Sequence, residues 1–290
     1  MTKNNTINTQ VPKKNYLQDD DSKNINPSPQ YESSDYRPAD KLKGKVAIIT
    51  GADSGIGAAV AIAFAKEGAH IIATDYNNQE DAKKLKKRIK EISGDILWLT
   101  GDVGDEEFVQ EVVDKTIQEY GHIDILVNNA AEQHNRESIS EITAAQLDRT
   151  FRTNIFSMFY FVKAALPYMK KNSKIINTAS VTAYKGSPEL LDYSSTKGAI
   201  VSFTRSLSQN KEILDKEIRV NAVAPGPIWT PLIQSTIPNE NKEKFGSSVP
   251  MDRTGEAYEL APSYVYLACE DSSYVSGQVL HVNGGTVING

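Results

Sequence analysis

The sequence contains a single cysteine, Cys269, so no disulfide can form within the chain. Such scarcity is typical of proteins in reducing compartments. No stretch approaches the roughly 20 consecutive apolar residues that span a membrane. The first residues, Met1-Thr2-Lys3-Asn4-Asn5-Thr6, contain no apolar segment like that of a secretory signal peptide. The sequence therefore predicts a cytoplasmic protein without a membrane partner.

The chain also lacks a large excess of charge of one sign. Its formal net charge is −5, which gives no electrostatic reason to expect nucleic acid or an anionic membrane as a partner. We identify no metal-ligating residues. Hydrophobic residues make up 39% of the 290 positions. The chain beyond about Lys41 can therefore bury a sizeable core.

Residues 1–40 have almost no aliphatic periodicity and are rich in Asn, Gln, Ser, Asp and Pro. Such a segment cannot bury enough apolar surface to offset the entropy lost on ordering. We expect a flexible extension. The alternative is an arm that docks on a neighbouring subunit through Tyr31, Tyr36 and Pro38. Residues 41–290 are predicted to form one catalytic domain.

From Lys45 onward, short β-rich runs alternate with helical stretches. The pattern predicts an α/β fold of the Rossmann type, with a doubly wound parallel seven-stranded sheet covered by helices on both faces. A long irregular stretch, residues 229–253, is expected to act as a lid beside the carboxyl ends of the strands. The predicted strands are 46–50, 71–74, 96–100, 123–127, 174–178, 218–223 and 278–282. The predicted helices are 56–67, 81–92, 106–120, a long helix reaching Pro167, and another that carries Tyr193 and Lys197.

A glycine-rich loop, Thr50–Gly57, joins the first predicted strand to its helix. Gly51 permits the tight turn, Gly55 removes a side chain where a pyrophosphate approaches, and Gly57 lets helix and strand pack closely. The helix N-terminus then offers free N–H groups to phosphates. The position of the glycine-rich loop directly after the first strand makes it a strong signal for dinucleotide binding.

Asp75 ends the second predicted strand, about 20 residues beyond the loop, where an acid binds the adenosine ribose. A carboxylate there repels a 2′-phosphate, and the flanking Ser54 and Tyr76 supply no compensating cation. NAD(H) is therefore favoured. Two alternatives stay open: Asp75 could merely cap a turn, and Lys83 and Lys84 could reach a phosphate, which would admit NADP(H).

Tyr193 and Lys197 lie at i and i+4 of one predicted helix and so share a face. An ammonium beside a phenol lowers the tyrosine pKa, which suits proton exchange with an alcohol near neutral pH. The alternative is an ordinary solvated pair.

The chain from Leu42 to its end resembles the short-chain dehydrogenase/reductase family. Five motifs match in order: the Thr50–Gly57 loop, Asp102-Val103, Asn128-Asn129-Ala130, the set Ser180, Tyr193 and Lys197 with Asn154 upstream, and Pro225-Gly226-Pro227-Ile228-Trp229-Thr230. The run Asn129-Ala130-Ala131-Glu132-Gln133, the N-terminal extension and the end Gly277–Gly285 look like the glucose/ribitol-dehydrogenase-like branch. One departure is Ala131, where the family usually has glycine; a methyl group there narrows the space near the nicotinamide.

The resemblance implies reversible hydride transfer between a nicotinamide and a secondary alcohol or carbonyl. Tyr193 would be the general acid/base, Lys197 would lower its pKa and bind the nicotinamide ribose, and Ser180 would position the substrate oxygen. Asn154 would hold a water that links Lys197 to solvent. The implied cofactor-binding residues are Gly51, Asp53, Ser54, Gly55, Ile56, Gly57, Asp75, Tyr76, Asp102, Val103, Asn129, Ala130, Ala131, Tyr193, Lys197, Pro225, Gly226, Ile228 and Thr230.

Taken singly, several of these residues have structural explanations. Ser180 could be a turn residue, Asn154 could bond back to the helix backbone, and Asp102 could cap the following helix. Asn129 more often stabilises the central sheet than touches a ligand. The ordered set favours the catalytic interpretation.

The expected substrate is a small polyol, sugar, aldehyde or ketone, contacted by Ser180, Gln133 and Tyr193. The other expected walls are the Val181–Leu191 loop and the lid, with the side chains of Glu189, Leu190, Leu191, Trp229, Ile233 and Gln234. The rivals are an NADP-dependent 3-oxoacyl or carbonyl reductase of the same family and a nucleotide sensor without catalysis. The resemblance also implies a homotetramer.

Overall fold

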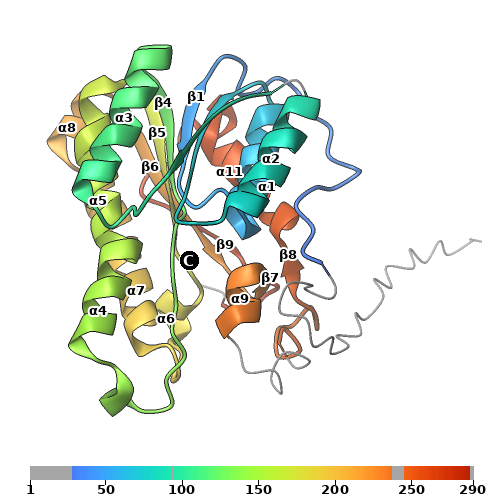
Figure 1. Ribbon diagram of the computed structural model, residues 1–290, viewed down its shortest axis with the longest axis vertical. Helices are drawn as coiled ribbons and strands as arrows, with labels where there is room; N and C mark the ends of the chain where they lie inside the picture. Colours follow the sequence, from blue (N-terminus) through green and yellow to red (C-terminus); the bar gives the residue numbers. More distant parts are fainter. Residues whose placement is uncertain (1–27, 93, 237–244, 288–290) are drawn as a thin grey trace, which may run out of the picture.

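The computed structural model describes residues 28–92, 94–236 and 245–287. Its centre is a parallel seven-stranded sheet with strand order β3-β2-β1-β4-β5-β6-β9 (Figure 1). This confirms the predicted doubly wound architecture. The strands are β1 (Val46–Ile49), β2 (His70–Asp75), β3 (Asp95–Thr100), β4 (Ile123–Asn128), β5 (Met169–Thr178), β6 (Arg219–Pro225) and β9 (Val279–Val282).

Helices cover both faces of the sheet, with α1, α2 and α11 on one side and α3, α5 and α7 on the other (Figure 1). The predicted helix 106–120 matches α3 at both ends, whereas α11 was not predicted. The helices of the domain are α1 (Gly55–Lys66), α2 (Gln79–Glu91), α3 (Glu106–Tyr120), α4 (Ala144–Phe151), α5 (Ser157–Ala165), α6 (Thr182–Lys185), α7 (Leu191–Ser208), α8 (Lys211–Asp215), α9 (Pro231–Thr236) and α11 (Ala257–Ala268).

The long helix predicted before Pro167 is not one continuous α-helix. It consists of α4, a π-helical turn η2 (Arg152–Phe156), α5 and a final 3₁₀ turn, Leu166–Tyr168. A π-turn accommodates an extra residue within a helix and is frequent at functional sites. Asn154 lies in this turn.

Helix α1 is apolar on almost every face, with the sequence GIGAAVAIAFAK. Such a helix is stable only when it is enclosed. It packs between the sheet and α11, in a core cluster that includes Phe64 and Tyr264. This burial fixes the start of α1, and with it the glycine-rich loop, relative to the strand ends.

Residues 28–40 of the predicted flexible extension lie against the chain's own helices. Glu32 forms ion pairs with Lys66 of α1 and Arg88 of α2, and Tyr36 donates a hydrogen bond to Glu67. Tyr31 packs against the core cluster of α1 and α11. Both tyrosines of the predicted arm are therefore engaged, but the surface they contact belongs to the same chain. Residues 1–27 lie outside the described part.

The predicted lid begins with β7 (Ile228–Trp229), which pairs in parallel with β8 (Gly255–Glu256). Helix α9 follows β7, and residues 237–244 of the lid lie outside the described ranges. The two short strands tie the start and the end of this long insertion together.

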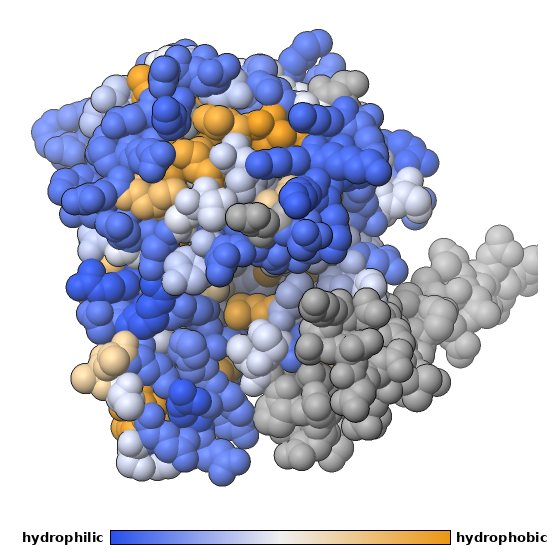
Figure 2. Space-filling view, viewed as in Figure 1, coloured by the Kyte–Doolittle hydropathy of each residue, from blue (hydrophilic) through white to orange (hydrophobic). Residues whose placement is uncertain are grey.

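Hydrophilic side chains dominate the visible face of the molecule, with apolar side chains in separate patches between them (Figure 2). Among the residues that the structure describes, no helix has the length and hydropathy needed to span a membrane.

Candidate active site

A cleft of about 640 Å³ lies at the carboxyl ends of the strands. In doubly wound sheets, ligands bind at this edge. All the predicted site residues except Gly57 and Asn154 line the cleft. Residues that the sequence did not single out also line it, among them Asn78, Arg149, Thr153, Thr178 and Leu232.

The glycine-rich loop has the backbone geometry that its sequence predicts. Gly51 and Gly55 have φ angles of +62° and +55°, a region in which other residues are strained. A Cβ on Gly57 would lie 2.1 Å from the Gly51 carbonyl oxygen. Ser54 makes no side-chain cap at the start of α1, so first-turn N–H groups can meet a phosphate. These features and the size of the cleft fit a dinucleotide.

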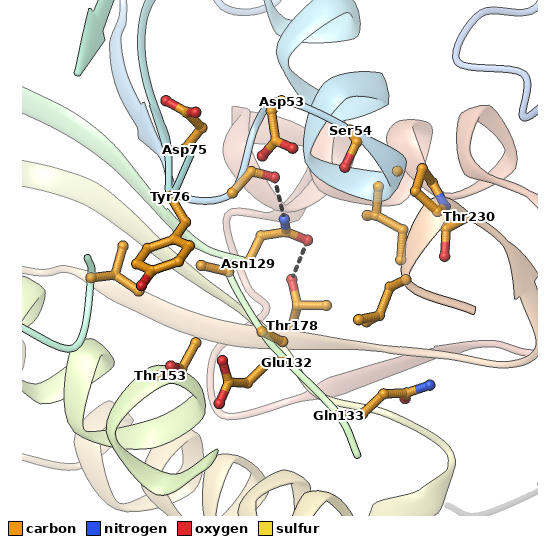
Figure 3. Close-up of a pocket in the computed structure, with 18 of the residues that line it drawn as sticks. Asp53, Ser54, Asp75, Tyr76, Asn129, Glu132, Gln133, Thr153, Thr178 and Thr230 are labelled. Carbon is orange, nitrogen blue, oxygen red and sulfur yellow. Dashed lines mark hydrogen bonds between the residues drawn. The ribbon is translucent and has the colours of Figure 1, made fainter. Parts of the chain in front are cut away.

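Asn129 holds the loop against the sheet (Figure 3). Its Nδ2 donates to the carbonyl oxygens of Thr50 and Gly51 at 3.0 and 3.1 Å. Its Oδ1 accepts from Thr178 Oγ1 at 3.3 Å. Both ends of the amide are therefore engaged in positioning the loop, as the structural explanation of Asn129 expects.

The Asp75 carboxylate is only 2% exposed and points away from Asn129 (Figure 3). It accepts hydrogen bonds from Trp98 Nε1 at 2.8 Å, Thr100 Oγ1 at 2.6 Å and the Asn78 N–H at 2.7 Å. The last bond is the turn cap that was the alternative interpretation of Asp75. A ribose hydroxyl would have to share a carboxylate that already has three donors.

Asn78 connects three carboxylates at this corner of the cleft. Its Nδ2 donates to Asp81 at 2.7 Å and to Asp53 at 3.4 Å, while its backbone N–H binds Asp75. Burial, with the charge of Asp75 as a smaller contribution, raises the pKa of Asp53. Lys83 and Lys84, the cations considered for a phosphate, pair instead with Glu80 and Asp81 on the exposed surface of α2. The corner is thus acidic.

The opposite wall contains an arginine that the sequence gave no reason to select. Arg149 of α4 forms ion pairs with Asp102 and with Glu132. Its guanidinium lies 5.2 Å from the centroid of the Tyr76 ring, within cation–π range. Asp102 does not cap α3, because Asp105 occupies that position. Arg149 therefore contacts two predicted cofactor residues, Asp102 and Tyr76, and also Glu132, which follows the predicted Ala131.

Tyr193, Lys197 and Ser180 meet at the centre of the cleft. The Lys197 Nζ lies 5.3 Å from the Tyr193 ring centroid and donates to the Thr178 carbonyl oxygen at 2.8 Å. Ser180 lies close enough to the Tyr193 hydroxyl to lower its pKa. Thr182, which the sequence did not indicate, donates to Ser180 Oγ from its hydroxyl at 3.0 Å and from its N–H at 3.1 Å. Thr182 thereby orients the serine.

The sequence analysis expected Lys197 to lower the pKa of Tyr193, and this expectation is wrong for the structure. Burial raises the pKa of Tyr193 to about 12, and Ser180 offsets only part of that effect. Burial also lowers the pKa of Lys197 to about 7. The prediction considered only the attraction between ammonium and phenolate. Desolvation, which disfavours both charged forms, is the larger effect in this enclosed site.

The lowered pKa of Lys197 predicts a pH-dependent stability. The unfolded chain holds the lysine proton up to about pH 10.5, whereas the folded chain loses it near pH 7. Stability rises with pH wherever the unfolded state binds more protons. Between pH 7 and 9, wild type should therefore gain on the order of 2 kcal/mol relative to Lys197→Met. Denaturant unfolding of both proteins at each pH measures this difference; parallel pH dependences would contradict it.

Asn154 is buried beneath the cleft wall, with 0% exposure. Its Oδ1 accepts from the Glu132 N–H, and its Nδ2 donates to the Glu132 carbonyl oxygen, both at 2.9 Å. Nδ2 also lies 3.1 Å from Thr196 Oγ1 on α7. The amide thus joins η2, the segment after β4 and α7. Its predicted water-holding role stays a prediction.

The predicted substrate wall is only partly correct. Gln133 and Ile233 line the cleft, and Gln133 Nε2 donates to Thr236 Oγ1 of α9 at 2.6 Å. Trp229 is 1% exposed and does not line the cleft. Within the described residues, the cleft lining includes neither the Val181–Leu191 loop nor Gln234. Leu232, Pro231 and Ser235 of α9 form the wall instead.

Comparisons with known proteins agree with this geometry. A family model described as enoyl-(acyl carrier protein) reductase matches residues 51–287. The chain is 53% identical over 269 residues to NADPH-dependent aldehyde reductase 1 of Arabidopsis thaliana, which covers 90% of this chain and 93% of that protein. It is 49% identical over 272 residues to the glucose and ribitol dehydrogenase of Daucus carota, with 92% and 93% covered.

Among solved structures, the chain resembles a 3-ketoacyl-(acyl-carrier-protein) reductase from Brucella melitensis complexed with NADH. The TM-score is 0.77 at 32% sequence identity, and the match covers 85% of this chain and all of that one. The matches include relatives of the glucose and ribitol dehydrogenase type, as the sequence resemblance predicts. The chain therefore belongs to the short-chain dehydrogenase/reductase family and is an NAD(P)-dependent oxidoreductase.

Proposed function

We propose that the protein transfers a hydride between NAD(H) and a secondary alcohol or carbonyl of a small polyol, sugar, aldehyde or ketone. The observation that carries this proposal is the meeting of Tyr193, Ser180 and Lys197 in a cleft that begins at the glycine-rich loop. The nicotinamide supplies the hydride chemistry when bound. Tyr193 exchanges the proton, because a hydroxyl with a raised pKa holds its proton at neutral pH and can donate it to a carbonyl oxygen.

Ser180 and Lys197 support this proton transfer. Ser180 Oγ, which accepts two hydrogen bonds from Thr182, is proposed to donate to the oxygen that gains negative charge. Lys197 is fixed by the Thr178 carbonyl oxygen and is proposed to bind the nicotinamide ribose. Asn154 holds α7, the helix of Tyr193 and Lys197, against the cleft wall through its hydrogen bond with Thr196. These positions orient the reacting groups before substrate arrives.

A substrate panel assayed with both cofactors tests the proposal. Polyols, sugars, aldehydes and ketones are supplied with NAD⁺ and NADP⁺ or with NADH and NADPH. We expect turnover of at least one alcohol–carbonyl pair. Cofactor binding without turnover anywhere in the panel would favour the nucleotide-sensor alternative.

The acidic corner predicts which cofactor is used. Asp53 and Asp75 line the cleft beside the region expected to receive the adenosine ribose, and Asn78 joins both to Asp81; like charges repel a 2′-phosphate. We expect a lower KM for NADH than for NADPH. Asp53→Asn should lower the KM for NADPH several-fold, roughly the effect of removing one partly screened charge, with little change for NADH.

Asp114→Asn on α3 is the matched control, because it removes one negative charge from a surface residue whose partner is Gln110. It should leave both KM values unchanged. A wild-type preference for NADPH would support the alternative, an NADP-dependent carbonyl reductase, which the name of the Arabidopsis thaliana relative favours. The cytoplasmic location and the homotetramer remain proposals alongside this function.

A further inference from the structure

A chain of hydrogen bonds runs from α11 to the glycine-rich loop. The Tyr264 hydroxyl lies 2.8 Å from Thr178 Oγ1, which lies 3.3 Å from Asn129 Oδ1. The Asn129 Nδ2 in turn donates to the carbonyl oxygens of Thr50 and Gly51. Figure 3 shows the bond between Thr178 and Asn129 in the middle of this chain. The chain thus joins α11, the end of β5, the residue after β4 and the loop.

The direction of each of these hydrogen bonds follows from the groups involved. Asn129 must turn Nδ2 toward the loop, because its two partners there are carbonyl oxygens, which only accept. Its Oδ1 therefore faces Thr178, and the single hydroxyl proton of Thr178 is used in that bond. Thr178 Oγ1 must then accept from Tyr264. Burial raises the pKa of Tyr264, so its hydroxyl keeps the proton that it donates.

Both hydroxyls are enclosed by the fold. Tyr264 is 0% exposed and belongs to the apolar core cluster of α1 and α11, while Thr178 is 5% exposed. A polar group in such surroundings costs free energy unless it is hydrogen-bonded. A phenylalanine would fill the Tyr264 position with the same apolar ring and no polar atom to satisfy. The hydroxyl is therefore not needed for packing, and its hydrogen bond serves to orient Thr178.

The backbone of Thr178 serves the catalytic side of the cleft. Its carbonyl oxygen accepts from Lys197 Nζ at 2.8 Å. Thr178 is the last residue of β5 and is paired with Val223 of β6. The sheet thus holds the backbone that positions Lys197, and the side chain of the same residue points to the loop. The hydroxyl can be removed without changing the backbone contact.

We propose that Thr178 and Tyr264 are positioning residues of the cofactor site: their hydroxyls fix the orientation of the Asn129 amide and, through it, the Thr50 and Gly51 carbonyl oxygens. This inference rests on the proposed function. Gly51, at a φ of +62°, gives the loop more conformational freedom than another residue would. Ordering such a loop during binding costs affinity. The two hydroxyls order it before the cofactor arrives.

Thr178→Val tests the inference, because valine has nearly the shape of threonine and suits a strand but offers no donor to Asn129. Binding of NADH and of NADPH to the full-length proteins is titrated by nicotinamide fluorescence, so the readout is independent of turnover. Thr178→Val should raise the Kd of the preferred cofactor about 5-fold or more, the loss expected when a buried acceptor is left without its donor. Thr178→Ser keeps the hydroxyl and should restore binding close to that of wild type.

Thr204→Val is the matched control for Thr178→Val. Thr204 is also buried and also bonds an asparagine, accepting from Asn177 Nδ2 at 2.9 Å, but it does not line the cleft. The substitution should lower the melting temperature and leave Kd unchanged.

Tyr264→Phe removes the far end of the hydrogen-bond chain. It should raise Kd in the same direction by a smaller factor, because Thr178 keeps its proton for Asn129 and loses only the donor that orients it. Tyr266→Phe is the control on the same helix, since Tyr266 is 36% exposed. That variant should bind the cofactor as wild type does.

An unchanged Kd in Thr178→Val would overturn the inference. An equal rise of Kd in Thr178→Ser would also overturn it, because the hydroxyl would then not be the group that matters. An equal rise in Thr204→Val would show that the substitution acts through global stability alone. An unchanged Kd in Tyr264→Phe would overturn the role of Tyr264. Wild type that binds neither cofactor would overturn the proposed function itself.

Discussion

Tyr193→Phe should reduce turnover by about two to four orders of magnitude, the usual contribution of a positioned acid or base. The substitution removes the hydroxyl beside Ser180 and leaves the ring in place. Cofactor binding should persist, because the glycine-rich loop and Asn129 are unaffected. Steady-state kinetics and an NADH titration on the same preparation separate the two effects.

Tyr120→Phe is the control for this experiment. Its hydroxyl donates a hydrogen bond to Asp95 at the surface. Tyr120 is the last residue of α3, just before β4 begins, so it lies at the amino ends of the strands, opposite the cleft. Activity should stay at the wild-type level. Near-normal turnover in Tyr193→Phe would refute the assignment of the proton donor, even if Tyr120→Phe behaves as expected.

Gly57→Ala should abolish measurable cofactor binding and lower stability by about 1–3 kcal/mol, the usual cost of overpacking. The new methyl carbon would stand 2.1 Å from the Gly51 carbonyl oxygen and 2.7 Å from Asn129 Nδ2. Both neighbours belong to the framework of the loop, so α1 must move away from β1. That movement breaks the hydrogen bonds by which Asn129 holds the loop. Thermal melting and NADH titration measure the two consequences.

Gly198→Ala offers the same chemical change in α7 without the clash. A Cβ at this position meets no atom within 4 Å, and alanine is the better helix former. Its stability should therefore equal or exceed that of wild type. Tight NADH binding by Gly57→Ala would show that the loop does not need the close approach of helix and strand.

The sequence was sufficient to predict the parallel sheet, the glycine-rich loop and the residues that gather on the cleft. These features depend on local patterns: apolar runs of strand length, glycines at fixed spacing and a Tyr/Lys pair one helical turn apart. Parallel strands then bring their carboxyl ends to one edge whatever the details of packing. For this reason even the distant Thr230 lies on the same cleft as Gly51.

The state of Asp75 could not be predicted, because it depends on the neighbouring strand. The register pairs Asp75 with Thr100 and Ala73 with Trp98, which places both donors beside the carboxylate. Arg149 was missed for a similar reason, since its partners Asp102 and Glu132 come from segments far from α4 in sequence. Pair contacts of this kind leave no periodic signal along the chain.

Burial and backbone geometry explain the remaining errors. Trp229 has the side-chain type of a pocket wall, yet it is buried in the fold and does not line the cleft. The pKa of Tyr193 follows the solvent exclusion of the finished site rather than the charge of its neighbour. Residues 28–40 were expected to be flexible because the segment has low overall hydrophobicity. The alternative, a docking arm, named Tyr31 and Tyr36 but placed them on a neighbouring subunit, whereas both contact their own chain.

The π-turn η2 lies between α4 and α5. Each residue advances an α-helix by about 100°. The wide π-turn absorbs one such step, so deleting one residue between Arg152 and Phe156 would restore a regular helix in which α4 and α5 keep their relative phase. The residues within the turn would rotate instead, and the Asn154 amide would lose Glu132 and Thr196. A change of one residue in length, with every side chain type retained, would thus separate the cofactor side of the cleft from α7.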